Sequence, residues 1–206
     1  AFENTGTISV NSGILTIENY VSTSGKINIK EGATFAITKD ELITIPDLTF
    51  EKTDSSTEDF AILEGNLSVE NATYNSADIQ TKGTIKLPTT TEENKIDNLK
   101  IESGNLTIEN LHGAYLTNAG TLSTKTVTVT QNITNSGSMD VATTNVGGNL
   151  TDNGTWNSDG IINFVGTNDQ SFDSNPVTTY VLINVEKTGG ILTLANDLSE
   201  KNFVLK

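Results

Sequence analysis

Short runs of alternating apolar and polar residues, separated by turn residues, fill almost the whole chain. No segment has the i, i+3, i+4, i+7 spacing of an amphipathic helix, so the pattern predicts an all-β protein. Each run has room for two inward-facing apolar side chains, which indicates strands of four or five residues. Over the first 45 residues the predicted strands are Thr7–Val10, Ile14–Ile17, Lys26–Ile29, Thr34–Ile37 and Leu42–Ile45.

The pattern repeats at two levels. A heptapeptide, Gly-Asn-Leu-Thr-Ile-Glu-Asn at residues 104–110, returns in variant form at 65–71 and 13–19, with fainter copies at 190–196 and 148–151. A second sub-repeat, such as Asn118-Ala119-Gly120-Thr121-Leu122, places glycines at positions 6, 25, 83, 120, 137 and 154, with gaps of 19, 58, 37, 17 and 17 residues. These gaps are close to multiples of about 17 to 20 residues, which is typical of a solenoid coil.

The sequence therefore predicts a right-handed parallel β-helix of about ten coils, with residues 1–206 forming a single repeat array. Two polar segments without alternation, near residues 51–60 and 88–97, are expected to project from it as loops. The alternative architecture is a pair of β-sandwich modules, which needs longer strands at a spacing of about 8 to 12 residues. The 17-residue glycine spacing disfavours this alternative.

Composition excludes several classes of function. The net charge is −14 and all 12 basic residues are Lys, so the clustered Lys and Arg of a nucleic-acid-binding protein are missing. There is no Cys, and no apolar run approaches the 18 or so residues of a membrane span. Because the chain opens and stops inside repeat units, we expect it to be a piece of a larger protein, with no membrane span in this segment.

The C-terminal quarter of the chain carries five motifs in a fixed order. They are Gly-Asn-Leu-Thr-Asp-Asn-Gly-Thr-Trp at 148–156, Gly-Ile-Ile-Asn-Phe-Val-Gly at 160–166, Gln-Ser-Phe at 170–172, Tyr-Val-Leu-Ile-Asn-Val at 180–185 and Gly-Ile-Leu-Thr-Leu-Ala-Asn-Asp-Leu at 190–198. In this order they resemble the repeat regions of large secreted surface proteins and adhesins of Bacteroidetes-type bacteria. Ser171-Phe172 departs from the usual Thr-Ile, and the Asn that normally precedes Leu182 is missing. The resemblance implies an extracellular β-solenoid attached to a cell surface, and it carries over no catalytic residue.

Candidate catalytic groups are few. His112 is the only histidine and lies in Leu-His-Gly, where we expect a turn. Parallel β-helices often carry polysaccharide lyases or glycosidases, which need two carboxylates about 5–10 Å apart. The candidates here are Glu18, Glu70, Glu102 and Glu109. They occupy equivalent repeat positions, so the sequence favours a solvated row at one corner, and we expect no enzymatic activity.

Calcium is a weaker hypothesis. The segment Asp152 to Gly160 and the acidic cluster Asp54 to Asp59 supply oxygen ligands at short spacing, but neither has the spaced acids of an EF-hand. We therefore expect no cofactor beyond a weakly indicated Ca²⁺. Asn-x-Ser/Thr triplets fall largely within the repeat, and asparagines at one corner of successive coils are expected to stack as a hydrogen-bonded ladder.

Three functions remain. The first is a structural or adhesive stalk, the second a carbohydrate-binding solenoid, and the third a polysaccharide-degrading enzyme. The expected partners are other surface proteins, host or matrix glycans, or neighbouring copies of the chain. For the second function, the candidate ligand-contact aromatics are Trp156, Phe164, Tyr180 and Tyr115.

Overall fold

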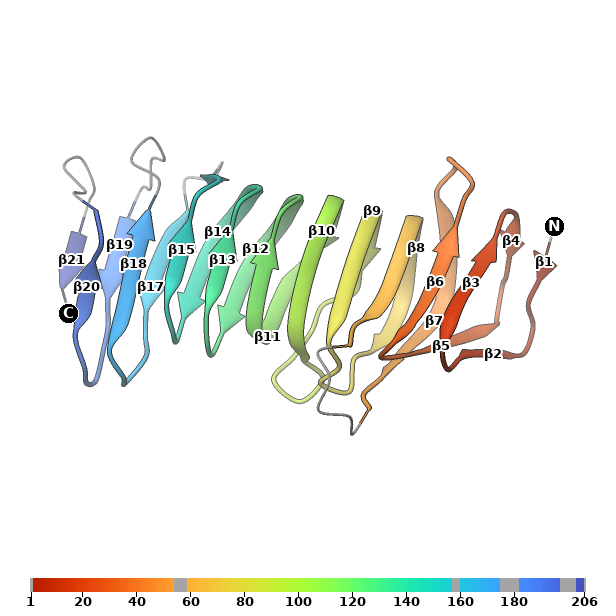
Figure 1. Cartoon of the computed structure of the whole chain (residues 1–206), viewed down its shortest axis with the longest axis horizontal. Coiled ribbons are helices and arrows are strands. Elements are labelled where there is room, and N and C mark those ends of the chain that lie inside the picture. Colours follow the sequence, from red (N-terminus) through yellow and green to blue (C-terminus); the bar gives the residue numbers. More distant parts are fainter. Residues whose placement is uncertain (1, 54–58, 157–159, 175–181, 197–202, 206) are drawn as a thin grey trace.

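The protein is an elongated stack of parallel β-strands, with β1 and β21 at opposite ends of the long axis (Figure 1). The computed structural model describes residues 2–53, 59–156, 160–174 and 182–196, and the backbone of 203–205. Within these residues there is no α-helix, and thus no helix that is long and apolar enough to cross a membrane. The stack confirms the predicted β-solenoid of about ten coils.

The strands are short, and several bend across a corner so that one strand contributes to two faces of the stack. In the first half of the chain they are β1 (Phe2–Glu3), β2 (Thr7–Val10), β3 (Gly13–Ile17), β4 (Tyr20–Val21), β5 (Lys26–Lys30), β6 (Ala33–Ile37), β7 (Ile43–Glu51), β8 (Ala61–Thr73), β9 (Ile79–Leu87) and β10 (Ile96–Ile108). In the second half they are β11 (Asn110–Asn118), β12 (Thr121–Val129), β13 (Ile133–Asn135), β14 (Ser138–Val146), β15 (Leu150–Asp152), β16 (Thr155–Trp156), β17 (Ile161–Phe164), β18 (Gln170–Ser174), β19 (Leu182–Val185), β20 (Leu192–Leu194) and β21 (Phe203–Leu205).

The pairing registers divide each coil into three faces. Face 1 consists of β3, β6, the starts of β8 and β9, the first half of β10, the end of β11, and then β13, β15, β18 and β20. Face 2 consists of the start of β7, the middle of β8, the ends of β9 and β10, the starts of β12 and β14, and β16. Face 3 consists of β2, β5, the ends of β7 and β8, the start of β11, the ends of β12 and β14, and then β17, β19 and β21.

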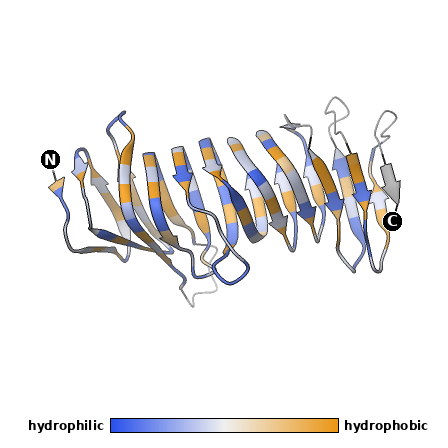
Figure 2. Ribbon diagram, turned by 180° about the vertical axis from the view of Figure 1, so that it is seen from behind, coloured by the Kyte–Doolittle hydropathy of each residue, from blue (hydrophilic) through white to orange (hydrophobic). Residues whose placement is uncertain are grey.

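The period of the coil is the one that the glycine spacing predicts. Leu116, Ile133 and Leu150 are aligned on adjacent coils of face 1, at intervals of 17 residues. All these pairings are parallel, so the backbone hydrogen bonds between coils run along the long axis. Alternate side chains of each strand point inward and form one continuous apolar core. Figure 2 shows the corresponding alternation of hydrophobic and hydrophilic residues along the strands.

Six glycines form a column at the corner between face 1 and face 2, and they come from both sub-repeats. They are Gly65, Gly83, Gly104, Gly120, Gly137 and Gly154. A Cβ atom on Gly104 would lie 2.1 Å from the carbonyl oxygen of Gly83, and one on Gly137 would lie 2.0 Å from that of Gly120. The backbones of neighbouring coils therefore approach too closely at this corner for any side chain.

The heptapeptide itself does not stay on one face. The copies at 65–71 and 104–110 run along face 2 in β8 and β10, whereas the copies at 13–19 and 148–151 begin β3 and β15 on face 1. A strand on any face requires the same pattern, a turn residue followed by two inward apolar residues. One motif therefore serves on either face.

A ladder of polar side chains runs inside the solenoid on face 1. Asn118 donates from Nδ2 to Oδ1 of Asn135 at 2.8 Å, and Asn135 donates in the same way to Oδ1 of Asp152 at 2.7 Å. All three side chains are fully buried. The same oxygens accept the N–H of the glycine two residues later, for example that of Gly137 at 3.2 Å, so the ladder also fixes the turn into the glycine column.

A second ladder runs along the outside of face 3. Asn163 donates to Oδ1 of Asn145 at 2.8 Å, and Asn184 donates to Oδ1 of Asn163 at 2.8 Å. The Asn-x-Ser/Thr asparagines behave differently, since Asn132 accepts the backbone N–H of Asn149 at 2.8 Å. Stacked amide ladders are thus confirmed, but they are built by other asparagines than those of the triplets.

Two insertions interrupt the regular coils where the sequence predicts loops. The first lies between β7 and β8; Glu51, which the prediction assigned to it, belongs to β7, and residues 54–58 are outside the described residues. The second runs from Pro88 to the start of β10 at Ile96, so it is slightly shorter than the predicted 88–97 (Figure 1). Tyr74 fastens the second insertion: it stacks on Phe50 at 5.8 Å and donates its hydroxyl to the carbonyl of Pro88 at 2.6 Å. Burial of Tyr74 raises the pKa of its hydroxyl far above the ordinary value.

One inward position of face 3 carries a hydroxyl in place of a methyl group. Thr144 is 1% exposed, lies between Val127 and Ile162 on the adjacent coils, and has no hydrogen-bond partner for Oγ1 among the described residues. A buried hydroxyl without a partner costs about 1–3 kcal/mol. We expect Thr144→Val to raise the free energy of unfolding by about 1 kcal/mol in urea denaturation. Thr143→Val, on the outer side of the same strand, should change it by less than about 0.5 kcal/mol, and an equal effect of both would contradict this account.

Candidate functional site

The solenoid is hollowed where the insertions break its regular coils. One groove of about 500 Å³ lies on face 1 and is lined by Phe60, Asp78, Asn98, Leu99, Lys100, Tyr115 and Thr117. A hollow of about 410 Å³ lies on face 2, and one of about 390 Å³ lies on face 3 beside the second insertion. A fourth hollow, of about 350 Å³, lies at the N-terminal end and has one aromatic lining residue, Phe2. We consider the face 1 groove first, because two aromatic residues line it.

The strand register places four of the groove residues in one row. Phe60 and Asp78 precede Ala61 and Ile79, which are paired, and Asn98 is paired with Tyr115 on the next coil. The row therefore reads Phe60, Asp78, Asn98, Tyr115 over four successive coils. Since adjacent strands lie about 4.8 Å apart, the two aromatic residues stand about 14 Å apart along the long axis.

The two aromatic side chains are differently supported. Tyr115 is 43% exposed on the outer side of β11. Phe60 is half-buried, its carbonyl accepts the N–H of Gly32 at 3.1 Å, and the Nζ of Lys100 lies 5.9 Å from its ring centroid. The Nζ of Lys100 also lies 3.5 Å from a carboxylate oxygen of Glu102. The ammonium group of Lys100 therefore interacts with both an acidic side chain and an aromatic ring.

A buried carboxylate organises this part of the solenoid. Glu31 is 7% exposed, and one of its oxygens accepts the N–H and the hydroxyl of Thr53 at 2.7 and 3.0 Å. Its other oxygen accepts the N–H of Asp78 at 2.8 Å. Glu31 thereby connects Thr53, which follows β7, to the coil that carries Asp78.

The groove has its own electrostatic character. Burial raises the pKa of the Asp78 carboxyl above its ordinary value, and the charge of Glu31 adds to this effect, while hydrogen bonding to Asn98 opposes it. The N–H of Asn98 donates to Asp78 at 3.1 Å. Beside the groove, Lys52 donates to Asp97 at 2.8 Å, and this hydrogen bond raises the pKa of the Lys52 ammonium.

The raised pKa of Asp78 makes a prediction about stability. The folded state binds this proton more tightly than the unfolded state, so the stabilisation is complete at pH values below the ordinary pKa and is lost as the pH rises through the raised one. Asp78→Asn should therefore be more stable than the wild type at pH 7, by less than about 1 kcal/mol, and the gain should shrink at pH 4. Urea denaturation at both pH values measures this, with Asp140→Asn on the exposed side of face 2 as the control. A gain that is larger at pH 4 would contradict the sign.

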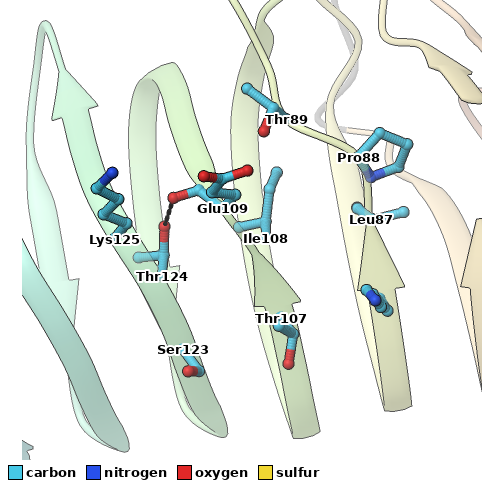
Figure 3. A pocket seen from close by; sticks show the side chains of 10 residues that line it. Leu87, Pro88, Thr89, Thr107, Ile108, Glu109, Ser123, Thr124 and Lys125 are labelled. Atoms are coloured by element: carbon cyan, nitrogen blue, oxygen red, sulfur yellow. Dashed lines mark hydrogen bonds between the residues drawn. The ribbon is translucent and has the colours of Figure 1, made fainter.

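The face 2 hollow has different chemistry. Figure 3 shows its lining side chains on adjacent coils, with the Thr124 hydroxyl donating to the carbonyl of Glu109 at 3.1 Å. Leu87 and Ile108 form an apolar floor, and Lys125 stands at the rim. It contains no aromatic ring. The face 3 hollow is lined by His112, Glu92, Lys95 and three smaller residues.

The structure separates the four aromatic candidates. Trp156 is 6% exposed and aligned with Met139 inside face 2, and Phe164 is fully buried with its ring centroid 5.4 Å from that of Phe172. This burial contradicts the expectation that these two contact a ligand. The period-two pattern of their strands already indicated this, because Trp156 and Phe164 fall on inward positions. Tyr180 lies outside the described residues, and only Tyr115 is exposed in a groove.

The acidic candidates are exposed but do not share a corner. Glu70 and Glu109 follow face 2 strands, whereas Glu18 and Glu102 follow face 1 strands. The prediction of a single row is therefore wrong, because the repeat copies lie on different faces. His112 lies within strand β11 and not in a turn, which corrects a further expectation.

Asp152, the first candidate calcium ligand, does not face solvent. Asp152 points into the solenoid, where it is fully buried and accepts hydrogen bonds from Asn135 and Gly154. Residues 54–58 and 157–159 of the two candidate segments lie outside the described residues. In the part of the chain that the structure describes, no group of three or more His, Cys, Asp or Glu side chains is arranged to hold a metal ion.

Comparison of the chain with family models, with curated proteins and with solved structures gives no significant match.

Proposed function

We propose that this chain is a structural and adhesive segment of a secreted bacterial cell-surface protein, in which the solenoid is a rigid spacer that displays a binding surface. The observation that carries the proposal is the continuous axial ladder of face 1, which extends from β3 to β20. Each coil packs only on its neighbours, so such a ladder sets a fixed distance between its two ends.

The surface chemistry supports an extracellular role. The net charge of −14 makes the surface predominantly acidic, which favours solubility. The outward positions of face 2 carry short hydroxyl side chains in register, such as Thr107 beside Ser123. The resemblance of residues 148–198 to secreted surface repeats points the same way. The partners we propose are other surface proteins, glycans or further copies of the chain.

Carbohydrate binding is the second candidate function, and the exposed Tyr115 in the face 1 groove favours it. Under both candidates we propose a role without catalysis. Incubation of the purified chain with polysaccharides, followed by an assay for new reducing ends, tests this point. The appearance of new ends would contradict a non-catalytic role.

Labelling of intact cells tests the location. An antibody raised against the purified chain should label unpermeabilised cells of the producing bacterium, and brief treatment of those cells with an external protease should remove the label. Labelling that appears only after permeabilisation would contradict the proposal. This experiment does not depend on whether any glycan binds.

A further inference from the structure

We propose that the face 1 groove binds a neutral oligosaccharide that lies along the solenoid axis, with sugar rings packed against Tyr115 and Phe60. This inference deepens the proposed function and rests on it, because an extracellular surface is where such a glycan is met. The groove has about the volume of a small-ligand site, at 500 Å³.

The aromatic walls supply the apolar contact. An exposed aromatic ring presents a flat, rigid apolar face at low conformational cost, and the C–H face of a pyranose ring packs on such a surface. Tyr115 is 43% exposed and Phe60 is half-buried at the other end of the row. Their separation of about 14 Å, three coil steps, leaves room for more than one sugar ring between them.

The residues between the walls supply hydrogen bonds. Asp78 and Asn98 occupy the two middle places of the row, and Thr117 lies on the neighbouring outward position next to Lys100. A carboxylate and an amide side by side offer acceptors and donors that suit adjacent sugar hydroxyls. Few polar groups placed on an apolar floor, here Leu99, are typical of sites that orient one ligand.

Charge selects a neutral glycan over an acidic one. The chain carries a net charge of −14, and Lys100, the groove's single cation, lies 3.5 Å from Glu102. A polyanion would meet the acids Asp78 and Glu102 within about one Debye length, which is about 8–10 Å at physiological salt. Neutral hydroxyls meet no such repulsion.

The groove is also preformed. Glu31 accepts the backbone N–H groups of Thr53 and Asp78, and the Nζ of Lys100 lies 5.9 Å from the ring centroid of Phe60. A ligand therefore does not have to order these side chains, which removes part of the cost of binding.

Affinity electrophoresis of the purified full chain tests the proposal. The gels contain a neutral polymer (a β-glucan, a mannan or a xylan) or an acidic one (polygalacturonate). We expect retardation by at least one neutral polymer, little change in that retardation between 50 and 500 mM salt, and no retardation by polygalacturonate. Tyr115→Ala should weaken binding at least tenfold, whereas Tyr115→Phe should retain most of it.

Phe2→Ala is the matched control, since Phe2 is 48% exposed but lies outside the groove. It should bind like the wild type. Circular dichroism should be unchanged in Tyr115→Ala and thermal melting nearly so, because Tyr115 is 43% exposed and its side chain lies outside the apolar core. Failure of every neutral polymer, wild-type binding by Tyr115→Ala, or salt-sensitive retardation by polygalacturonate would each overturn the proposal. The labelling of intact cells, which tests the proposed function, does not depend on these outcomes.

Discussion

Gly137→Ala is expected to destabilise the protein by about 3 kcal/mol or more, in spite of adding a single methyl group. The new Cβ would lie 2.0 Å from the carbonyl oxygen of Gly120 and 2.8 Å from the carbonyl carbon of Ala119. Both atoms belong to the backbone of the preceding coil, so no side chain can move aside. Relief requires that two coils separate locally, and this breaks ladder hydrogen bonds on either side of the corner.

Gly6→Ala is the matched control, because Gly6 occupies the same place in the same sub-repeat. Asn4 and Asn135 both accept the N–H of the glycine two residues later, at 3.1 and 3.2 Å. A Cβ on Gly6, however, would meet no atom within 4 Å. Gly6→Ala should therefore change the free energy of unfolding by less than about 0.5 kcal/mol in thermal or urea denaturation. Equal losses in the two variants would show that stacking of the corner is not the cause.

Asn135→Asp is the second substitution with a large expected effect. The Nδ2 of Asn135 donates to Asp152 at 2.7 Å, and both side chains are 0% exposed. The replacement would set two buried carboxyls side by side with no donor between them. We expect a loss of about 3–5 kcal/mol at pH 7, the range seen when one partner of a buried charged pair is removed.

The loss should depend on pH in a defined direction. Two carboxyls that share one site raise the pKa of one of them, so the folded variant gains a proton more readily than its unfolded chain. The destabilisation should therefore shrink as the pH falls toward 4 and grow as it rises to 7. Asn153→Asp, on an exposed neighbouring residue, adds the same charge without the clash and serves as the control.

The double variant Asn135→Asp with Asp152→Asn closes the cycle. It restores one amide and one carboxyl at the same place in the ladder, with the donor and the acceptor exchanged, so most of the lost stability should return. Persistence of the full loss in the double variant would mean that the carboxyl pair is not its source. Melting curves of the wild type, the two single variants Asn135→Asp and Asp152→Asn, and the double variant, at pH 4 and pH 7, measure the coupling between the two positions.

The fold could be predicted from the sequence because the length of a solenoid coil appears in the sequence as a repeat of the same length. Residues 118 to 156 repeat every 17 positions, and the same interval appears between the paired residues Asn118 and Asn135. Local alternation then indicates the inward positions, as at Ile27 and Ile29, which are fully buried. The sequence did not indicate the face on which a given copy of the heptapeptide lies, because all three faces need the same turn residue and the same pair of inward apolar residues.

The candidate groove was harder to predict for a related reason. Tyr115 was named from its side chain alone, and Trp156 and Phe164 were named with it although their alternation places them inside. Phe60, Asp78 and Asn98 were not recognised, because they become neighbours only through the register of coils whose lengths the two insertions change. Glu31, 47 residues away from Asp78 in sequence, could be linked to it only by the folded structure.

The hydrogen bonds between coils are parallel to the long axis, and this gives the protein a particular response to tension. A pull on the two ends loads the coils in series, so an end coil peels away before the ladders of the middle are disturbed. Each 17-residue coil occupies about 4.8 Å of the axis while folded but spans about 60 Å as an extended chain. Under the proposed adhesive function, this extra length would be released one coil at a time when the attachment is pulled.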